Sequence, residues 1–179
     1  ERSDELESIG RDLNLISRYA DSKYPRIRYD EAVETLQGMG VEIEWGQDLD
    51  YSKEKVLTKD YDVPHFLTHY PKIAKPFYHR PDPEDDKYVL CHDLLAPEGY
   101  GEIIGGGQRE DDLDILVNRI RHHDLPLEPF QWYLALRKYG SVPHSGFGLG
   151  IERTVGWICG TKHIRETIPY PRTMYRIEP

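Results

Sequence analysis

The chain has 179 residues, of which 31% are charged, and its formal net charge is -9. This length suits one domain with a hydrophobic core of its own, and no apolar run approaches the roughly 20 residues that cross a bilayer. The acidic balance argues against a protein whose main nucleic-acid-binding surface lies within this chain alone.

The two cysteines, Cys91 and Cys159, lie far apart and form no C-x-x-C pair. This spacing disfavours a zinc site or a disulfide framework and favours a reducing, cytoplasmic environment. We expect both thiols to be small buried apolar groups. No signal-peptide pattern opens the chain. Because it starts at Glu1 and not at a methionine, we expect a piece of a longer polypeptide.

The first third of the chain predicts helices that pack and do no chemistry. Apolar residues at helical spacing indicate a single amphipathic helix over residues 3–19, capped by Ser3 or Asp4. A second helix is expected over residues 31–37, with Asp30 as its cap.

The middle of the chain changes from an irregular connection to a sheet. Residues 41–62 are polar, with a short strand possible at 41–45 and a short helix at 52–60. Two strands separated by a proline turn are then expected at 65–71 and 75–83.

The segment Lys87–Arg109 reads as strand, turn and strand, and each strand bears one carboxylate, Asp93 and Glu102. If the strands pair antiparallel, both carboxylates can face one side and hold a divalent cation such as Mg²⁺. Two acids nine residues apart are also common as ordinary surface charges, so the spacing alone leaves this alternative open.

Three consecutive glycines, Gly105, Gly106 and Gly107, deny side chains to one face of the second strand, where a small substrate could lie. Arg109 follows Glu102 by an odd number of residues, so a β-bulge at the glycines must re-aim it if both face one ligand. The alternative for Arg109 is a surface salt bridge with the acids that follow it.

The last third predicts two more helices before a glycine-rich strand. Residues 110–123 form an amphipathic helix with acids in its first turn, and residues 128–140 form another with an aromatic face that suits a core. His144 follows; it is either near a pocket or a hydrogen-bonded structural histidine.

Glycines at alternate positions then precede an arginine and a helix. Gly146, Gly148 and Gly150 suit a strand packed under a flat ligand, because a chain without side chains permits close approach. Arg153 opens the following helix, and its planar, permanently charged fork suits phosphate or a base. Glycines before a helix can also merely relieve crowding.

These residues carry a resemblance to a known family. The segment GFGLGIER, residues 146–153, resembles the third signature motif of class II aminoacyl-tRNA synthetases. The flanking RKYGSVPHSG and HIRETIPYPR, with YGEIIGGGQREDD and FLTHYPKIAKPFY upstream, resemble the C-terminal end of the asparaginyl members of that family. The resemblance covers everything after about Pro25.

The resemblance implies an α+β fold in which an antiparallel sheet is flanked by helices. Residues 1–179 would then form the C-terminal portion of the catalytic domain. The chain shows no candidate for the first or second family motif, or for the anticodon-binding domain that precedes them. Arg26 and Arg28 are rejected as the second motif's arginine, because a capped helix follows them instead of a returning strand.

The resemblance also implies the reaction, which is ATP-dependent activation of asparagine and its transfer to tRNA by a cytoplasmic homodimer that does not enter membranes. Residues matching the family's positions take its roles. Arg153 is catalytic and binds ATP together with Gly146, Gly148, Gly150 and Glu102; Asp93 and Glu102 hold Mg²⁺; Arg109, Gly105 and Gly106 bind the amino acid.

Three alternatives remain open from the sequence. The glycines before QRE resemble the asparaginyl pattern more than the aspartyl one, yet an aspartyl-tRNA synthetase is the nearest rival. A paralogue that makes free asparagine and a non-catalytic binding module are the others. We expect the chain alone to be inactive.

Overall fold

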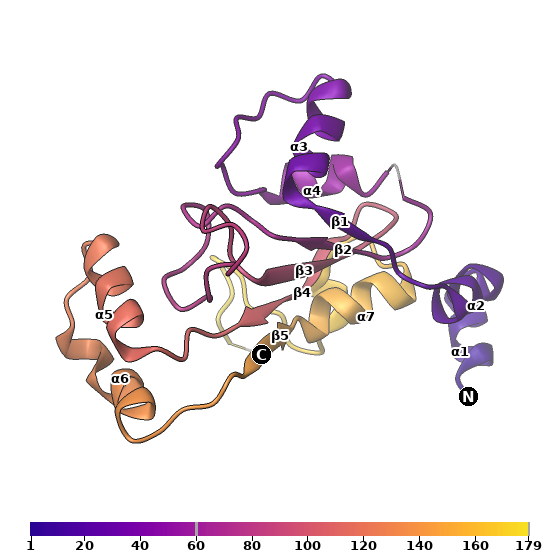
Figure 1. The fold of residues 1–179 in the computed structure, drawn as a ribbon. Helices are drawn as coiled ribbons and strands as arrows, with labels where there is room; N and C mark the ends of the chain where they lie inside the picture. The colour runs from indigo at the N-terminus through magenta and orange to yellow at the C-terminus, as the bar shows by residue number, and fades with distance from the viewer. Residues whose placement is uncertain (60, 179) are drawn as a thin grey trace.

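The computed structural model describes residues 1–59 and 61–178. A five-stranded sheet lies at its centre, with the strands in the order β1-β2-β3-β4-β5 (Figure 1). Only the edge pair β1–β2 is parallel, and the other neighbours are antiparallel. The strands are β1 (Arg26–Arg28), β2 (His65–Thr68), β3 (Cys91–Ala96), β4 (Gly101–Gln108) and β5 (Ser145–Leu149).

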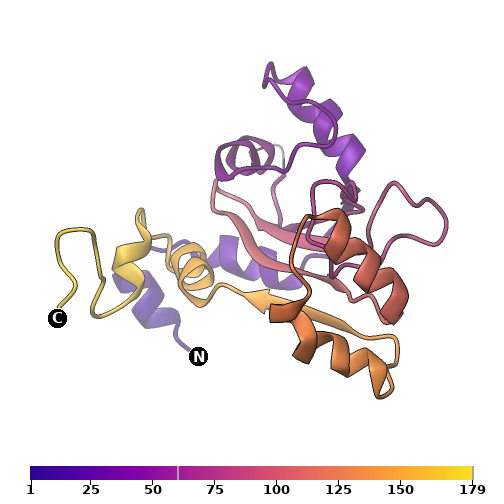
Figure 2. The same cartoon turned by 90° about the vertical axis from the view of Figure 1, so that its left-hand side faces the viewer.

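Helices cover both faces of this sheet, which confirms the predicted α+β class. Figure 1 shows α3 and α4 on one side and α7 on the other, while Figure 2 shows α5 and α6 side by side beyond the sheet. The α-helices are α1 (Ser3–Ser8), α2 (Leu13–Asp21), α3 (Tyr29–Gly38), α4 (Tyr51–Leu57), α5 (Leu113–His122), α6 (Gln131–Lys138) and α7 (Ile151–Cys159). Short 3-10 helices lie at Glu128–Phe130 and Ile164–Thr167.

Strand alternation divides the core into two layers. Leu95 points to the cluster that contains Leu36 of α3, whereas its neighbour Leu94 points to the cluster that contains Trp157 of α7. A third cluster joins α5 and α6 through Leu116 and Leu134. Adjacent residues of β3 therefore serve opposite faces, as period two requires.

The single helix expected over residues 3–19 is wrong, because the chain folds into two helices there. Gly10 takes a φ of +81° between them, a conformation that glycine adopts without strain. The side-chain cap belongs to Asp12, which accepts the amide hydrogens of Asn14 and Leu15 and so begins α2. No side chain caps α1.

Three other local expectations are also wrong. Asp30 does not cap α3; it lies inside the first turn, where its carboxylate accepts hydrogen bonds from Trp45 Nε1 and the Tyr88 hydroxyl. Residues 41–45 form no strand. The predicted strand at 75–83 is reduced to isolated bridges, since its prolines cannot donate to a ladder.

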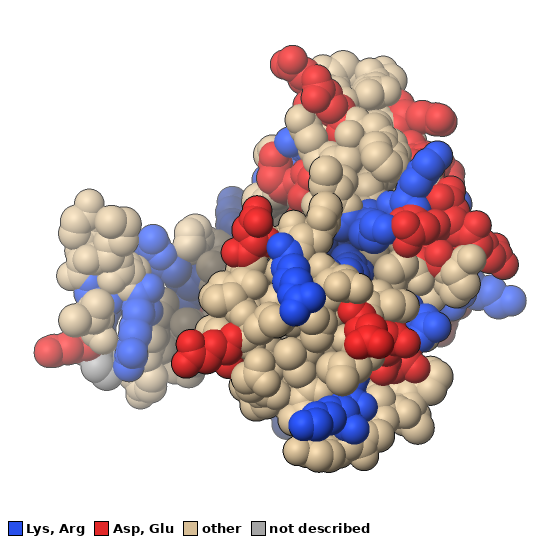
Figure 3. All heavy atoms as spheres, turned by 60° about the vertical axis from the view of Figure 1, so that its left-hand side comes forward, with Lys and Arg blue, Asp and Glu red and all other residues tan. Residues whose placement is uncertain are grey.

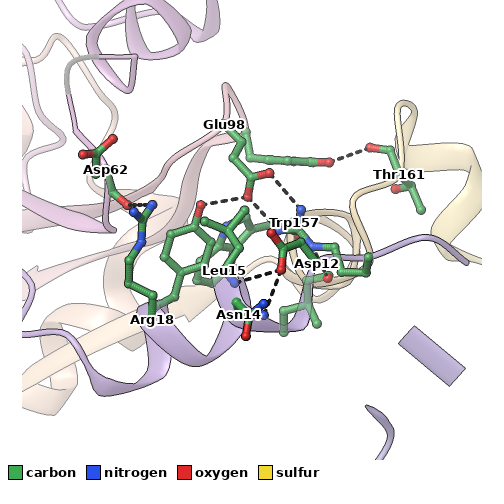
Figure 4. Close-up of polar contacts among 12 residues, drawn as sticks. Asp12, Asn14, Leu15, Arg18, Asp62, Glu98, Trp157 and Thr161 are labelled. Atoms are coloured by element: carbon green, nitrogen blue, oxygen red, sulfur yellow. Dashed lines mark hydrogen bonds and ion pairs between the residues drawn. The ribbon is translucent and has the colours of Figure 1, made fainter. Parts of the chain in front are cut away.

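A polar cluster ties the start of the chain to the far ends of β3 and α7 (Figure 4). The Arg11 guanidinium donates to both carboxylate oxygens of Glu98, at 2.8 and 2.6 Å, and to the carbonyls of Trp157 and Ile158. Tyr19 donates its hydroxyl to the same carboxylate. Arg11 thus caps α7 and holds it against the turn between β3 and β4.

None of the described helices combines the length and apolar character that crossing a membrane requires.

Candidate active site

A β-bulge brings the two predicted carboxylates to one face of the sheet. Asp93 pairs with Gly105, but the register then shifts, so that Leu95 pairs with Glu102 and Ile103 is left over. In a regular ladder Glu102 would have faced the side opposite to Asp93. The expected bulge therefore exists, but it lies at Ile103 rather than at the glycines.

The same bulge reconciles Arg109 with Glu102. Arg109 and Gly105 are an even number of residues apart, so both belong to the face that carries Asp93. A cavity of about 330 Å³ opens on this face. It is lined by Asp48, Lys75, Pro76, Tyr78, His79, Cys91, Asp93, Glu102, Gly105, Gly106 and Arg109. Three of the four charged residues singled out from the sequence share this cavity.

The fourth, Arg153, lies beside the cavity and does not line it. Its Nη1 donates to the backbone carbonyl of Glu102 at 2.7 Å and lies 3.4 Å from the carboxylate. The side chain is about half exposed and faces a second cavity of about 670 Å³, bounded also by Lys55 and Lys162. Arg153 therefore lies between the two cavities: it lines the larger one, and Glu102, which it contacts, lines the smaller one.

The guanidinium of Arg109 has an unsatisfied donor. It lies over the ring of Tyr78, with Cζ 4.9 Å from the ring centroid, and beside Gly146. Within the described part of the chain, its buried Nη1 has no hydrogen-bond partner. The alternative salt bridge is not formed, because Glu110 and Asp111 pair with Arg80 instead. A buried N–H group without an acceptor is costly, which suits a ligand oxygen here.

The glycines divide into two groups by strand alternation. A Cβ on Gly105 would lie 2.5 Å from Glu102 Oε1 and 3.3 Å from Asp93 Oδ1, so this glycine gives both carboxylates the room to converge. Gly148, its partner on β5, has nothing within 4 Å of a Cβ position. Gly106 faces the other side, where a Cβ would meet the Gly146 carbonyl and Phe147 at 2.8 Å. The prediction that Gly105, Gly106 and Gly107 together leave one face of β4 free of side chains is therefore wrong, because neighbouring glycines face opposite sides.

The other two predicted residues near β5 act through the backbone. The amide of Gly150, the residue before α7, donates to the Ile103 carbonyl at the bulge and fixes the start of that helix. His144 accepts the Arg109 amide on its carbonyl, while its exposed ring faces the Val142 carbonyl. The structure thus places His144 as a support for Arg109.

Lys75 also lines the cavity, although the sequence does not single it out. Its Nζ lies 3.0 Å from Asp93 and 3.2 Å from Asp48, and 3.8 Å from the centroid of the Tyr70 ring. Burial works against the charge on Lys75, but the Asp93 and Asp48 carboxylates outweigh it and raise the pKa of the ammonium group. The KPFY segment is the available signal for Lys75, but its pattern predicts a strand.

His79 and Glu54 were also missed. Burial, with help from the charges of Arg109 and Lys75, lowers the pKa of His79 to about 3, so the ring is neutral. Glu54 of α4 is buried, and burial raises the pKa of its carboxyl to about 7. Burial and the nearby Asp93 also raise the pKa of Glu102.

The donor set fits a cation that takes few protein ligands. In the described residues, no group of three or more histidine, cysteine or acidic side chains could hold a metal alone. Two converging carboxylates meet the preference of Mg²⁺ for one or two carboxylates plus phosphate oxygens and water.

On the outer surface, the face in Figure 3 shows basic side chains in separate small groups among acidic and uncharged ones.

Comparison with known proteins decides the family. Residues 4–174 match the tRNA synthetases class II (D, K and N). The chain belongs to this family. The resemblance drawn from the glycine-rich motif is thereby confirmed.

The relatives of this class II synthetase chain point to its asparaginyl branch. It is 53% identical over 178 residues to the asparagine–tRNA ligase of Desulforamulus reducens, covering 99% of this chain and 41% of that protein. It matches the Pyrococcus horikoshii asparaginyl-tRNA synthetase complexed with asparaginyl-adenylate with a TM-score of 0.94 and 51% identity, over 99% of this chain and 41% of that one.

The aspartyl branch is more distant. The aspartyl-tRNA synthetase of Entamoeba histolytica matches with a TM-score of 0.80 and 30% identity, over 87% of this chain and 33% of that one.

The chain spans about two fifths of the length of the asparaginyl relatives that it matches.

Proposed function

We propose that this chain supplies the amino-acid-binding and cation-binding part of the active site of an asparagine–tRNA ligase. In the first step, a carboxylate oxygen of asparagine attacks the α-phosphorus of ATP. The bond from that phosphorus to the bridging oxygen breaks, and pyrophosphate leaves. The asparaginyl group then passes from AMP to the 3′ end of tRNA.

The main support is that an unpartnered donor and a pair of carboxylates share one cavity. Arg109 Nη1 needs an acceptor, and the side-chain oxygen of asparagine would supply it. Asp93 and Glu102, which line the same cavity, would hold Mg²⁺. When bound, that ion neutralises charge on the phosphates of ATP. Lys75 balances Asp93 and keeps the carboxylate in place.

The nucleotide is assigned to the adjoining surface of β5 and α7. Gly148 leaves open space where the adenine could lie flat, and Arg109 and Arg153 border this space beside Gly146 and Gly150. The half-exposed fork of Arg153 uses its Nη1 for both hydrogen bonds to Glu102, so its other donors remain for a phosphate. The chemistry then rests mainly on orientation and charge.

The remaining parts of the enzyme are proposed to lie outside this chain, which covers about two fifths of its relatives. They are the first and second family motifs, the anticodon-binding domain and the homodimer contacts. Binding of tRNA would use the whole protein, in agreement with the net charge of -9 here. The enzyme would act in the cytoplasm.

Exchange of labelled pyrophosphate into ATP by the full-length protein tests this function. We expect exchange that depends on asparagine and on a divalent cation, and at least about 100-fold less with Arg109→Ala, which removes the side-chain contact. Aspartate-dependent exchange would identify the aspartyl branch instead. ATP binding that Arg153→Ala abolishes, with no exchange for either amino acid, would leave the binding-module alternative.

A further inference from the structure

Glu54 is a buried carboxylate that contacts the backbone of Glu102, one of the two proposed cation ligands, from outside the cavity. Its side chain belongs to α4, is only 6% exposed and is absent from the lining of the cavity. Its Oε2 accepts a hydrogen bond from the backbone amide of Glu102 at 2.9 Å. The residue thus acts on Glu102 through the main chain and not through the ligand.

This hydrogen bond lies at the bulge that orients Glu102. Because Ile103 is left out of the pairing between β3 and β4, the ladder there is interrupted, and a backbone donor needs another acceptor. Glu54 provides that acceptor. Gly101 makes the approach possible, since a Cβ there would lie 2.8 Å from Glu54 Oε2, and its φ is +70°.

The helix that presents Glu54 is fixed at both ends. Asp50 accepts the amide hydrogens of Ser52 and Lys53 and so begins α4. At the other end, Leu57 is fully buried in the cluster that also contains Leu95 of β3. The position of the carboxylate is therefore determined by the core and does not depend on a bound ligand.

The hydrogen bond connects Glu54 directly to a residue of the proposed cation site. Its Oε2 accepts from the main-chain amide of Glu102, whose side chain supplies one of the two converging carboxylates. Residues that orient metal ligands through such outer hydrogen bonds are typical of metal sites.

We propose that Glu54 is a positioning residue for the Mg²⁺ site, which fixes the bulged backbone so that the Glu102 carboxylate meets Asp93. This inference rests on the proposed function, because it presupposes that these two carboxylates bind the cation. The hydrogen-bond acceptor, rather than the charge, carries the larger part of the effect, because it is the acceptor that sets the direction of Glu102.

The test measures binding of Mn²⁺, as a probe for Mg²⁺, to the full-length protein by electron paramagnetic resonance. We expect Glu54→Ala to weaken Mn²⁺ binding about tenfold. Glu54→Gln keeps an acceptor and should stay within about threefold of the unmodified protein. Glu34→Gln, an exposed acid on α3, is the matched control and should change nothing.

A second readout separates positioning from general stability. In pyrophosphate exchange, Glu54→Ala should raise the Mg²⁺ concentration for half-maximal rate about tenfold, while the KM for asparagine, which is set near Arg109, stays within about twofold. If Glu54→Ala does not fold, Glu54→Met fills the same space without an acceptor, and the same losses are expected of it.

The possible failures are distinct. If Asp93→Asn leaves Mn²⁺ binding unchanged, the cation site of the proposed function is wrong, and the role of Glu54 is wrong with it. If Asp93→Asn abolishes binding but the folded Ala or Met variant binds normally, only the role of Glu54 is overturned. Equal losses in the Gln and Ala variants would also overturn it, because the charge would then matter and not the acceptor.

Discussion

Replacement of Arg11 by alanine should loosen α7 although Arg11 lies more than 140 residues away in the sequence. The side chain is 8% exposed and makes four hydrogen bonds, two to Glu98 and one each to the carbonyls of Trp157 and Ile158. It also holds the pKa of Glu98 below its usual value. Removing Arg11 leaves an acid and two helix-end carbonyls without this donor.

The expected loss follows from the burial of the pair. Breaking a buried ion pair costs about 3–5 kcal/mol. We take the lower end, about 3 kcal/mol, because Glu98 is 30% exposed and keeps the hydroxyl of Tyr19. Since about 1.4 kcal/mol is a factor of ten in an equilibrium, amides of α7 should exchange with solvent roughly 100-fold faster.

Hydrogen exchange of the full-length protein, read by mass spectrometry on peptides covering α7 and the β3–β4 turn, measures this change directly. Arg2→Ala is the control, because its ion pair with Glu5 is exposed and should contribute less than about 1 kcal/mol. If Arg11→Ala speeds exchange in α7 by no more than about threefold, the stabilisation of α7 by the Arg11 hydrogen bonds is refuted.

The remaining predictions concern the glycines and a buried histidine. Gly107→Ala should lower the free energy of unfolding in urea by several kcal/mol, because its Cβ would lie 2.7 Å from the Leu90 carbonyl and 2.8 Å from Cys91 Cα. Gly148→Ala has open space around its Cβ position. It should leave urea unfolding unchanged and weaken ATP binding measured by calorimetry. Burial lowers the pKa of His65 to about 4, below its unfolded value of about 6.5. The contribution of the neutral His65 ring to the free energy of unfolding is therefore complete above pH 6.5 and is lost as the pH drops toward 4. His65→Phe should remove up to about 3 kcal/mol of this acid sensitivity in urea titrations at several pH values, whereas a change at the exposed His122 should not; equal pH profiles for His65→Phe and the unmodified protein would contradict the assignment.

Local patterns were sufficient to predict the central hairpin. The apolar run before Asp93 and the turn residues Pro97 and Gly99 indicate two strands, and β3 and β4 form there. The pattern also required a bulge between Glu102 and Arg109. Its location at Ile103 could not be predicted, because it depends on an acceptor that α4 supplies from another part of the chain.

The parts of the site that were missed are charges whose role comes from tertiary contacts. Glu54 lies in a segment whose composition indicates an exposed connection, and Lys75 lies at the start of a predicted strand, yet the structure places Glu54 against Glu102 and the largely buried Lys75 against Asp93. Sequence spacing also could not show that Arg153 reaches the Glu102 backbone while facing a second cavity. The single helix predicted over residues 3–19 is wrong for a local reason, since Gly10 takes a positive φ and Asp12 begins a second helix.

The central claim is that one cavity seats asparagine at Arg109 while the adjoining surface seats ATP at Arg153. Calorimetric titration of the full-length protein with asparagine alone and with ATP alone tests it most directly. Arg109→Ala should weaken asparagine binding at least about tenfold and leave ATP within about twofold, and Arg153→Ala should do the reverse. If the two variants weaken both ligands equally, or neither, the division of the site between these two arginines is contradicted.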